Sequence, residues 1–454
     1  MKTSLQYVHS TMLIAVLLTC LPPAAKTAAA DDWPRWNGPT RDGVIHEEGI
    51  LTEIPAEGLR KLWEHPVKLG YAGPAVVGGR VYVPDYQKSS GKIVNNPGTR
   101  DELTGRERLL CLDAATGKEL WKHEYEQAYA VSYGGGPRAT PTVHDGRVYM
   151  LGAEGALTCL QADSGKVLWS HDLKREYQSK TPQWGHAAAP LVYHNSLICL
   201  VGGPDSLVVS FDRVSGREQW RALAGENHGY CPPTVITAGG VDQLLIWDPE
   251  TLHSLNPDNG REYWQFALKP GYGMSILPPV LENNLLFTSG EGDASLMLKL
   301  ADDSPTAEEL WRGNARTSMY LATGAAIFDN GHLYGSDIRS GALVCARASD
   351  GKRLWQTAVP TSGSKRGRGG NYASAFLMKI DSRYLIFSET GDMISATLTP
   401  EAYHETGRFH AIDPTGNAMG RTLAWTYPAV SDGRLFLRND QQVVCYDLSA
   451  DGQP

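Results

Sequence analysis

The sequence predicts an all-β chain that folds as a single eight-bladed β-propeller of four-stranded blades. Three observations predict this fold class. One motif recurs at spacings of 44 to 51 residues, a two-stranded hairpin precedes each copy, and 48 Gly and 27 Pro are spread over 454 residues without a long helical pattern. The last blade is expected to be closed by an N-terminal strand around Trp63.

The recurring motif is an apolar strand, a glycine-containing turn and a strand that carries tryptophan. Five copies align without a gap: "CLDAATGKELW", "CLQADSGKVLW", "SFDRVSGREQW", "SLNPDNGREYW" and "CARASDGKRLW", ending at Trp121, Trp169, Trp220, Trp264 and Trp355. A sixth copy ends at Trp311 and lacks the glycine. The glycine is expected at positive φ in the turn, and the tryptophan is expected to fill the gap between neighbouring blades.

The hairpins before the motif supply the two inner strands of each blade. Segments such as "PTVHDGRVYML" and "PAVSDGRLFLR" place a tight turn between alternating apolar runs, and eight such hairpins can be counted. In the last repeat, the outer tryptophan would fall just beyond position 454. The segment "KLWEHPV" around Trp63 matches the missing strand, so we expect it to close the ring and remove its free edge.

The first thirty residues read as a secretory signal. Lys2 provides a positive end, residues 12–21 form an apolar run, and Ala28-Ala29-Ala30 offers a cleavage site. We therefore predict a periplasmic or secreted protein with no transmembrane segment. A lipoprotein anchored through Cys20 is disfavoured, because threonine precedes that cysteine. The predicted division is a signal peptide (1–30), an N-terminal segment that packs on the propeller (31–60), the propeller (61–449) and a tail (450–454).

The net charge restricts the possible partners, and the cysteine positions predict whether disulfides form. The net charge of −8 gives no basis for binding nucleic acid, and we expect a monomer. Six cysteines remain after the signal peptide. We expect none in a disulfide, because four recur at one repeat position and should lie in separate blades: Cys111, Cys159, Cys345 and Cys445.

These motifs resemble those of a known family. The repeats look like the tryptophan-docking repeats of quinoprotein dehydrogenases and of the outer-membrane assembly lipoprotein BamB. The opening "DWPRWNGPTRDGV" and the ending "GRLFLRNDQQVVCYDL" resemble a group of exported bacterial PQQ-like propellers. The resemblance implies the fold but does not assign a chemistry.

Candidate binding residues cluster in the loops that join the outer strand of one blade (strand D) to the inner strand of the next (strand A). These D–A loops share one face, at the mouth of the central channel. They are rich in aromatic and cationic residues, and the candidates are Arg138, Trp184, His186, His228, Tyr230, Tyr272, Tyr320 and Tyr372. The alternative is that these rings only pack the channel top. We expect no metal site. The alternative is that His186 and His228 share a metal ion with Cys231 or Met274.

Two other features are polar. Acidic residues recur where strand B meets strand C, and we interpret them as turn formers and not as a calcium site: Glu154, Asp205, Asp248, Glu291, Asp293, Asp337, Glu389 and Asp440. In the first blade, the connection from Pro84 to Arg108 is much longer than in the others. We expect it to be a polar loop that folds over the channel mouth.

Two functions remain open from the sequence. The first is a binding scaffold that holds a protein partner, a small molecule or a sugar through the D–A loop face. The alternative is a quinoprotein-type oxidoreductase that uses PQQ with Ca²⁺ on an alcohol or sugar. The chain lacks the adjacent cysteines on which such enzymes stack the quinone, and its calcium ligands cannot be placed. We therefore favour the scaffold over an enzyme.

Overall fold

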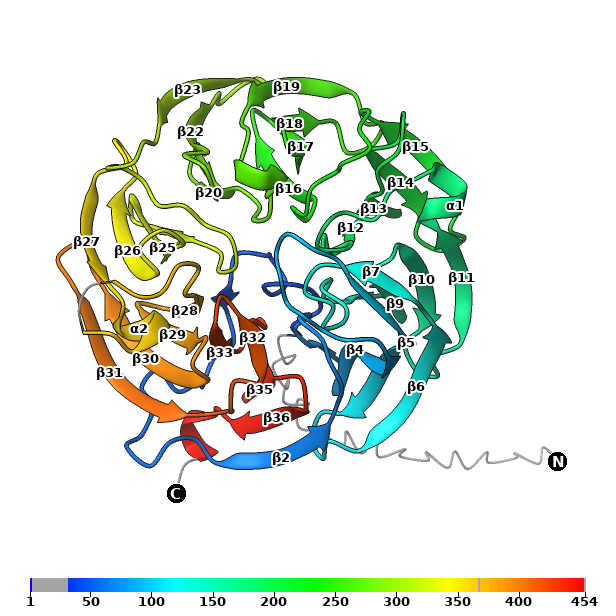
Figure 1. Cartoon of the computed structure of the whole chain (residues 1–454), viewed down its shortest axis with the longest axis horizontal. Coiled ribbons are helices and arrows are strands. Elements are labelled where there is room, and N and C mark those ends of the chain that lie inside the picture. Colours follow the sequence, from blue (N-terminus) through cyan, green and yellow to red (C-terminus); the bar gives the residue numbers. More distant parts are fainter. Residues whose placement is uncertain (2–31, 366–367, 453–454) are drawn as a thin grey trace. The chain divides into compact units, whose positions relative to one another are not determined.

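The structure, a computed structural model, describes residue 1 and residues 32–365 and 368–452. Apart from Met1, the predicted signal peptide with Cys20 lies outside the described residues, as do the last two residues of the predicted tail. Residues 32–452 form a ring of eight four-stranded sheets, which confirms the predicted eight-bladed propeller (Figure 1). Among the described residues, no helix is both long and apolar enough to cross a membrane.

Each blade is an antiparallel sheet of four strands, A to D from the channel outward, and in blades 1 to 7 the four strands are consecutive in the sequence and in their sheet. Blade 1 is β3–β6 (Ala75–Val77, Arg80–Ser90, Asp101–Asp113, Glu119–Glu126), and blade 2 is β8–β11 (Thr142–His144, Arg147–Leu151, Ala156–Gln161, Val167–Asp172). Blade 3 is β12–β15 (Leu191–Tyr193, Ser196–Leu200, Val208–Asp212, Glu218–Ala222), and blade 4 is β16–β19 (Thr234–Ala238, Val241–Trp247, Thr251–Leu255, Glu262–Ala267).

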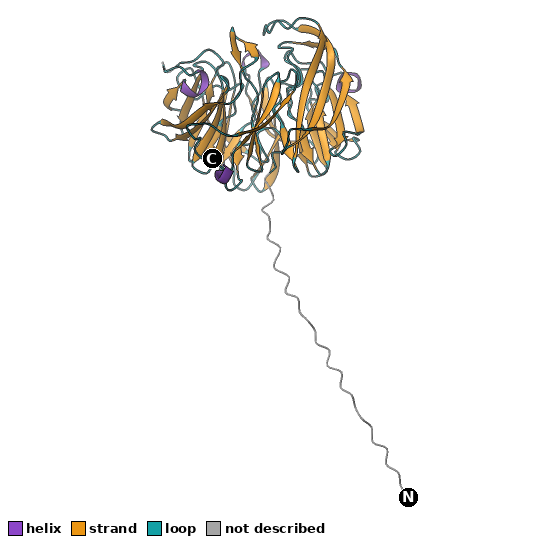
Figure 2. Ribbon diagram, turned by 90° about the horizontal axis from the view of Figure 1, so that it is seen from below, coloured by secondary structure: helices purple, strands orange, loops and turns teal. Residues whose placement is uncertain are grey.

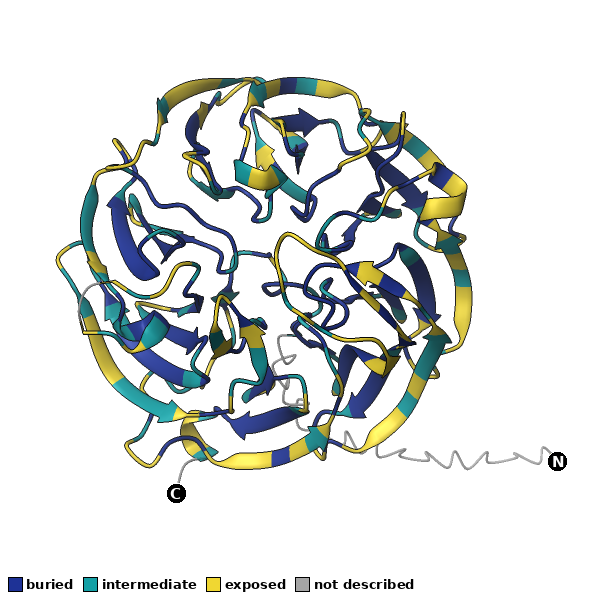
Figure 3. Ribbon diagram, in the orientation of Figure 1, coloured by how far each residue is buried: buried dark blue, intermediate teal, exposed yellow. Residues whose placement is uncertain are grey.

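The second half of the ring repeats this pattern. Blade 5 is β20–β23 (Val280–Glu282, Leu285–Ser289, Ser295–Leu300, Ala307–Arg312), and blade 6 is β24–β27 (Ile327–Asp329, His332–Asp337, Ala342–Arg347, Arg353–Thr357). Blade 7 is β28–β31 (Ala375–Ile380, Arg383–Ser388, Asp392–Leu398, Tyr403–His410). Blade 8 joins β34–β36 (Ala429–Ser431, Arg434–Arg438, Gln442–Asp447) to β2 (Lys61–Pro66). The middle strands are buried and the outermost strands are largely exposed (Figure 3).

The motif tryptophans join neighbouring blades through the motif glycines. Gly117 and Gly165 have φ of +70° and +69°, as expected for the turn. They also face the tryptophan of the preceding blade, because an added Cβ would lie 2.5 Å from the Trp63 ring and 2.4 Å from the Trp121 ring. The indole N–H of Trp121 then donates to Ala162 O of the next blade (3.0 Å). The glycine is therefore required twice, for its φ and for the close approach of the indole.

The ring is closed by the N-terminal strand, as the sequence predicts. Strand β2 pairs antiparallel with β36, with Trp63 opposite Cys445. The Trp63 ring lies 5.9 Å from that of Phe436, and its N–H donates to Ala114 O of blade 1 (2.9 Å). One side chain from the start of the chain thus joins the last blade to the first.

The segment before β2 crosses the central channel (Figure 1). Trp33 exchanges two backbone hydrogen bonds with Val76 of blade 1, and Arg41 donates to Pro190 O (2.6 Å) and Pro233 O (2.7 Å) at the starts of blades 3 and 4. Strand β1 (Val44–Ile45) then pairs parallel with β28 of blade 7. This one segment therefore forms hydrogen bonds with the inner parts of blades 1, 3, 4 and 7.

Two hairpins project from the D–A face of the ring (Figure 2). The first is the β4–β5 hairpin of blade 1. The sequence predicted a polar loop from Pro84 to Arg108, but β4 stays paired with β5 from Arg80 to Ser90, so only residues 91–100 form the tip. Alternate residues of β5 face inward, so the polar sequence continues the sheet. The second hairpin is β32–β33 (Gly416–Ala418, Arg421–Leu423), before blade 8.

The described residues also include four short helices: α1 (Leu173–Tyr177), α2 (Val359–Ser362), η1 (Gly271–Gly273) and η2 (Ala450–Gly452).

The six cysteines among the described residues are buried free thiols. Burial raises the pKa of Cys111, Cys159 and Cys445 to about 12 and that of Cys345 to about 11. Since the thiolate is the reactive form, we expect no alkylation of the native protein at pH 8. For the chain without residues 1–30, six alkylated thiols are expected after denaturation without reductant. Mass spectrometry of both samples measures this, and a disulfide-linked peptide pair would contradict it.

Candidate functional site

A cavity of about 770 Å³ opens at the D–A face, in the middle of the ring. Its walls come from the D–A loops and its floor from the channel-crossing segment, through Trp36, whose ring lies 5.1 Å from that of Tyr427. Pro97 and Gly98, at the tip of the β4–β5 hairpin, line one side, and Met419 of the β32–β33 hairpin also lines it. The predicted loop face and the hairpin tips therefore enclose one site.

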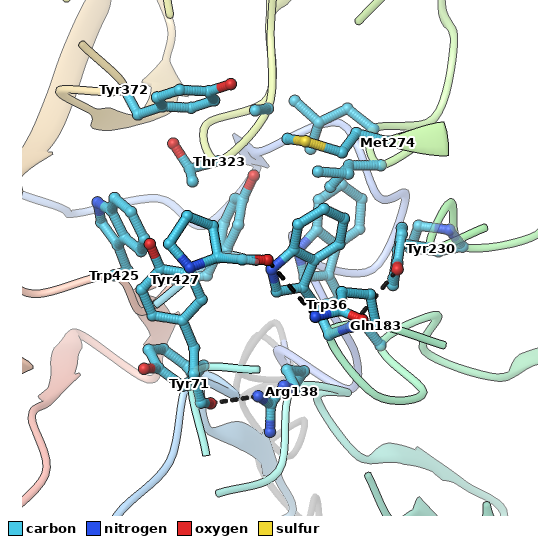
Figure 4. A pocket seen from close by; sticks show the side chains of 18 of the residues that line it. Trp36, Tyr71, Arg138, Gln183, Tyr230, Met274, Thr323, Tyr372, Trp425 and Tyr427 are labelled. Atoms are coloured by element: carbon cyan, nitrogen blue, oxygen red, sulfur yellow. Dashed lines mark hydrogen bonds between the residues drawn. The ribbon is translucent and has the colours of Figure 1, made fainter. Parts of the chain in front are cut away.

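Five of the eight predicted site residues line this cavity: Arg138, Trp184, Tyr230, Tyr272 and Tyr372. Trp184 and Tyr230 face each other with ring centroids 5.5 Å apart. Burial raises the pKa of Tyr230 and Tyr372 to about 12, so both phenols are neutral at neutral pH. Other rings of the D–A loops complete the wall, namely Tyr71, Trp425 and Tyr427 (Figure 4). Tyr133 also lines the cavity.

Arg138 is the charged side chain of the cavity wall. Its guanidinium donates to the backbone carbonyls of Ser132 (2.9 Å), Tyr133 and Gly136, and lies 5.3 Å from the centroid of the Tyr71 ring. Arg138 therefore holds its own loop and one wall ring in place.

The structure does not bring the other three candidates to the cavity. His186 and His228 are each 1% exposed and stack behind the wall, with ring centroids 4.8 Å apart and planes at 28°. The His186 ring packs against Gly155 and the His228 ring packs against Gly202, both in B–C turns. The two rings therefore lie behind the cavity wall and not in the channel. Tyr320 is fully buried, and its hydroxyl donates to Asn314 O (2.6 Å).

The histidine pair is held neutral by its surroundings. Both nitrogens of His186 and Nδ1 of His228 are buried without a hydrogen-bond partner. Burial lowers the pKa of His186 to about 3, with a smaller contribution from Lys174, and burial lowers the pKa of His228 well below its usual value. Among the described residues, no group of three or more His, Cys, Asp or Glu side chains is arranged to hold a metal ion.

Several of the acidic residues of the B–C connections hold the D–A loops, while Asp248 bonds the amides of its own turn as predicted. Glu154 accepts a hydrogen bond from Ala130 N (2.7 Å), Asp337 from Tyr320 N (3.0 Å) and Glu389 from Ser374 N (2.9 Å). The interpretation of these residues as turn formers was therefore incomplete, because their carboxylates position the loops that carry the cavity rings.

Trp36, Phe376 and Met419 are among the lining residues that the sequence did not indicate. Trp36 stands outside the repeats, so no repeated position marked it. Met419 belongs to the β32–β33 hairpin, which the predicted repeat did not include, so no repeated position marked it either.

Fold and cavity together define a PQQ-like repeat propeller with an aromatic cavity on its loop face. The family model described as "Outer membrane protein assembly factor BamB" matches residues 105–357, more than half of the chain. The chain belongs to this family.

Comparison with solved structures gives the same fold. BamB from Moraxella catarrhalis is 15% identical, with a TM-score of 0.53 over 87% of this chain and 99% of that chain. The quinohemoprotein alcohol dehydrogenase from Comamonas testosteroni is 13% identical, with a TM-score of 0.57 over 93% and 81%. A europium-containing methanol dehydrogenase is 12% identical, with a TM-score of 0.55 over 91% and 89%. At these identities the likeness shows the fold alone. No curated protein matches the chain.

The cavity residues do not fit PQQ with Ca²⁺. Of the described residues that line the cavity, none is Asp, Glu or Cys, so a calcium ion would find no carboxylate there. Arg138, the cation that could face the acid groups of PQQ, already donates to three carbonyls. The nearby carboxylates of Glu154 and Glu389 are bound to loop amides and to Lys174 or Arg421.

Proposed function

We propose that this protein is an exported, monomeric binding propeller that holds a ligand in the aromatic cavity of its D–A face. The sequence pattern of the first thirty residues supports export. A concave, largely apolar cavity of this size with a few polar groups is the usual form of a ligand site.

The observation that carries the proposal is the backbone of three wall tyrosines. Tyr133, Tyr272 and Tyr372 have φ of +53°, +57° and +60°, the left-handed region that disfavours a bulky side chain. Rings that merely filled space would not require this conformation, whereas strained residues concentrate at binding sites. Tyr272 is 80% exposed at the cavity mouth, so packing within the protein does not account for its ring.

Replacing Tyr272 with Asn is expected to separate binding from stability. Asn adopts the left-handed region readily and little packing is lost, so we expect the free energy of unfolding to rise by about 0.5–1 kcal/mol. Ligand affinity should fall at least tenfold, because a stacking ring is removed. Urea unfolding and isothermal titration calorimetry measure the two effects.

The matched control is His194→Asn, at a strained, exposed position in the A–B turn of blade 3 (φ +49°). It should relieve similar strain and leave binding unchanged. A suitable panel for binding is 2-naphthol, 2-naphthoate, 2-naphthylmethylammonium and maltotriose. If none of these binds, or if Tyr272→Asn and Trp184→Ala both keep full affinity for the tightest one, the D–A cavity is not a ligand site.

A further inference from the structure

The lining of the cavity carries a single charge among the described residues. Of the described residues that line the cavity, only Arg138 carries a charge, and its donors are directed to the backbone carbonyls of its own loop. A charged ligand would lose its hydration on entry. The described lining offers no carboxylate for a cation, and for an anion it offers only Arg138, three of whose donors already bind its own loop.

Several polar groups of the wall are likewise engaged by the protein. The Tyr427 hydroxyl accepts a hydrogen bond from Ala325 N (2.9 Å), and the Thr323 hydroxyl bonds that of Ser374. The Tyr230 hydroxyl accepts a long hydrogen bond from Trp184 N (3.5 Å). The wall still offers a ligand the O–H donors of Tyr230 and Tyr427 and the hydroxyl of Tyr133, which has no partner among the described residues. A ligand with many more hydroxyls than these would leave some without partners, and each such group lowers affinity.

The remaining wall is apolar and adaptable. Met274, Ile276 and Leu277 extend the aromatic surface on the side of blade 5, and Met419 stands at the opposite hairpin. Thioether side chains adjust to the outline of an apolar partner and make favourable contacts with aromatic rings. A cavity wall of flat aromatic rings bordered by flexible thioether side chains suits a ligand with a fused or extended ring system.

We propose that the cavity binds a neutral, largely apolar ring compound, with any polar substituent directed to the mouth. This rests on the proposed function and names its ligand class. The ring system would lie among Trp36, Trp184 and Tyr230, the rings of the floor and one wall. At the mouth, the exposed Tyr272 would cover the outer end of the ring system. A polar substituent beside it would stay in contact with water, so that substituent need not be desolvated.

The test compares one bicyclic ring in three charge states, with a sugar as a fourth probe. Isothermal titration calorimetry of the full chain at pH 7 should give at least tenfold tighter binding of 2-naphthol than of 2-naphthoate or 2-naphthylmethylammonium. Maltotriose should show no measurable heat of binding. Trp184→Ala should weaken 2-naphthol binding at least tenfold, and Leu310→Ala, on the exposed outer strand of blade 5, is the control that should not change it.

Each other outcome contradicts one of the two proposals. If a charged probe or maltotriose binds as tightly as 2-naphthol and Trp184→Ala or Tyr272→Asn weakens that binding, the cavity is a ligand site and the ligand class is wrong. If no probe binds, or if neither substitution affects binding, the proposed function fails and the ligand class with it. Should Trp184→Ala not fold, Tyr272→Asn alone decides, because its side chain packs little against the protein.

Discussion

Deletion of residues 31–66 is expected to leave a chain that does not unfold cooperatively. Without β2, blade 8 keeps three strands and exposes the whole edge of β36, and blade 1 loses the Trp63 ring that covers Gly117. The same deletion removes the segment that ties blades 1, 3, 4 and 7 across the channel. Urea unfolding followed by tryptophan fluorescence and by far-UV circular dichroism measures the loss.

A point substitution isolates the contribution of ring closure. Trp63 is 8% exposed, and Trp63→Ala should lower the free energy of unfolding by about 3–5 kcal/mol. Leu62→Ala, at the neighbouring exposed position of the same strand, is the control and should change it by less than about 1 kcal/mol. A monomeric deletion protein with an unchanged cooperative transition would show that the ring does not depend on these residues.

Acid is expected to destabilise the protein well above the range in which carboxylates titrate. His186 has a pKa of about 3 when folded against about 6.5 when unfolded, so the unfolded chain takes up its proton first. The stability that comes from keeping this group neutral is complete above pH 6.5 and is lost as the pH falls toward 3. The free energy of unfolding should drop by about 2 kcal/mol between pH 6.5 and 5 for His186, and further for His228, whose pKa is lowered in the same direction.

Substitution of the pair tests the origin of this acid sensitivity. In the double variant His186→Leu, His228→Leu, the free energy of unfolding measured with urea should depend much less on pH between pH 6.5 and 5. His410 provides a control of opposite sign, because hydrogen bonds with Asp392 and Asp413 raise its pKa. That group stabilises the fold at low pH, so His410→Leu should make acid sensitivity slightly greater. An unchanged slope in the double variant would place the acid-labile groups elsewhere.

The fold could be predicted because the repeat constrains the chain many times over. The aligned tryptophans mark the outer strands, and the displaced copy at Trp63 shows where the ring closes. The long hairpin of blade 1 was mistaken for a loop because its sequence is polar, although strand pairing needs only alternation: Leu103 and Glu107 face inward while their neighbours face solvent. Composition alone does not reveal that alternation in a short polar segment.

The cavity was predictable in location and only partly in detail. Loop aromatic residues indicated the face at which it opens, and five candidates line it. Sequence position could not separate Trp184 from His186, two residues later, because the direction of each side chain depends on the partner turn at Gly155. The floor was missed because Trp36 reaches the site through long-range contacts that no local pattern encodes.

The channel-crossing segment has a consequence for the timing of folding. Residues 32–66 leave the ribosome before any blade, yet their partners in β28 and β36 are made last. Until synthesis ends, the early segment has no complete binding surface and the nascent arc of blades keeps two open edges. Contacts between segments so distant along the chain form slowly. Closure of the ring is therefore a late step of folding, possible only once β36 has been made.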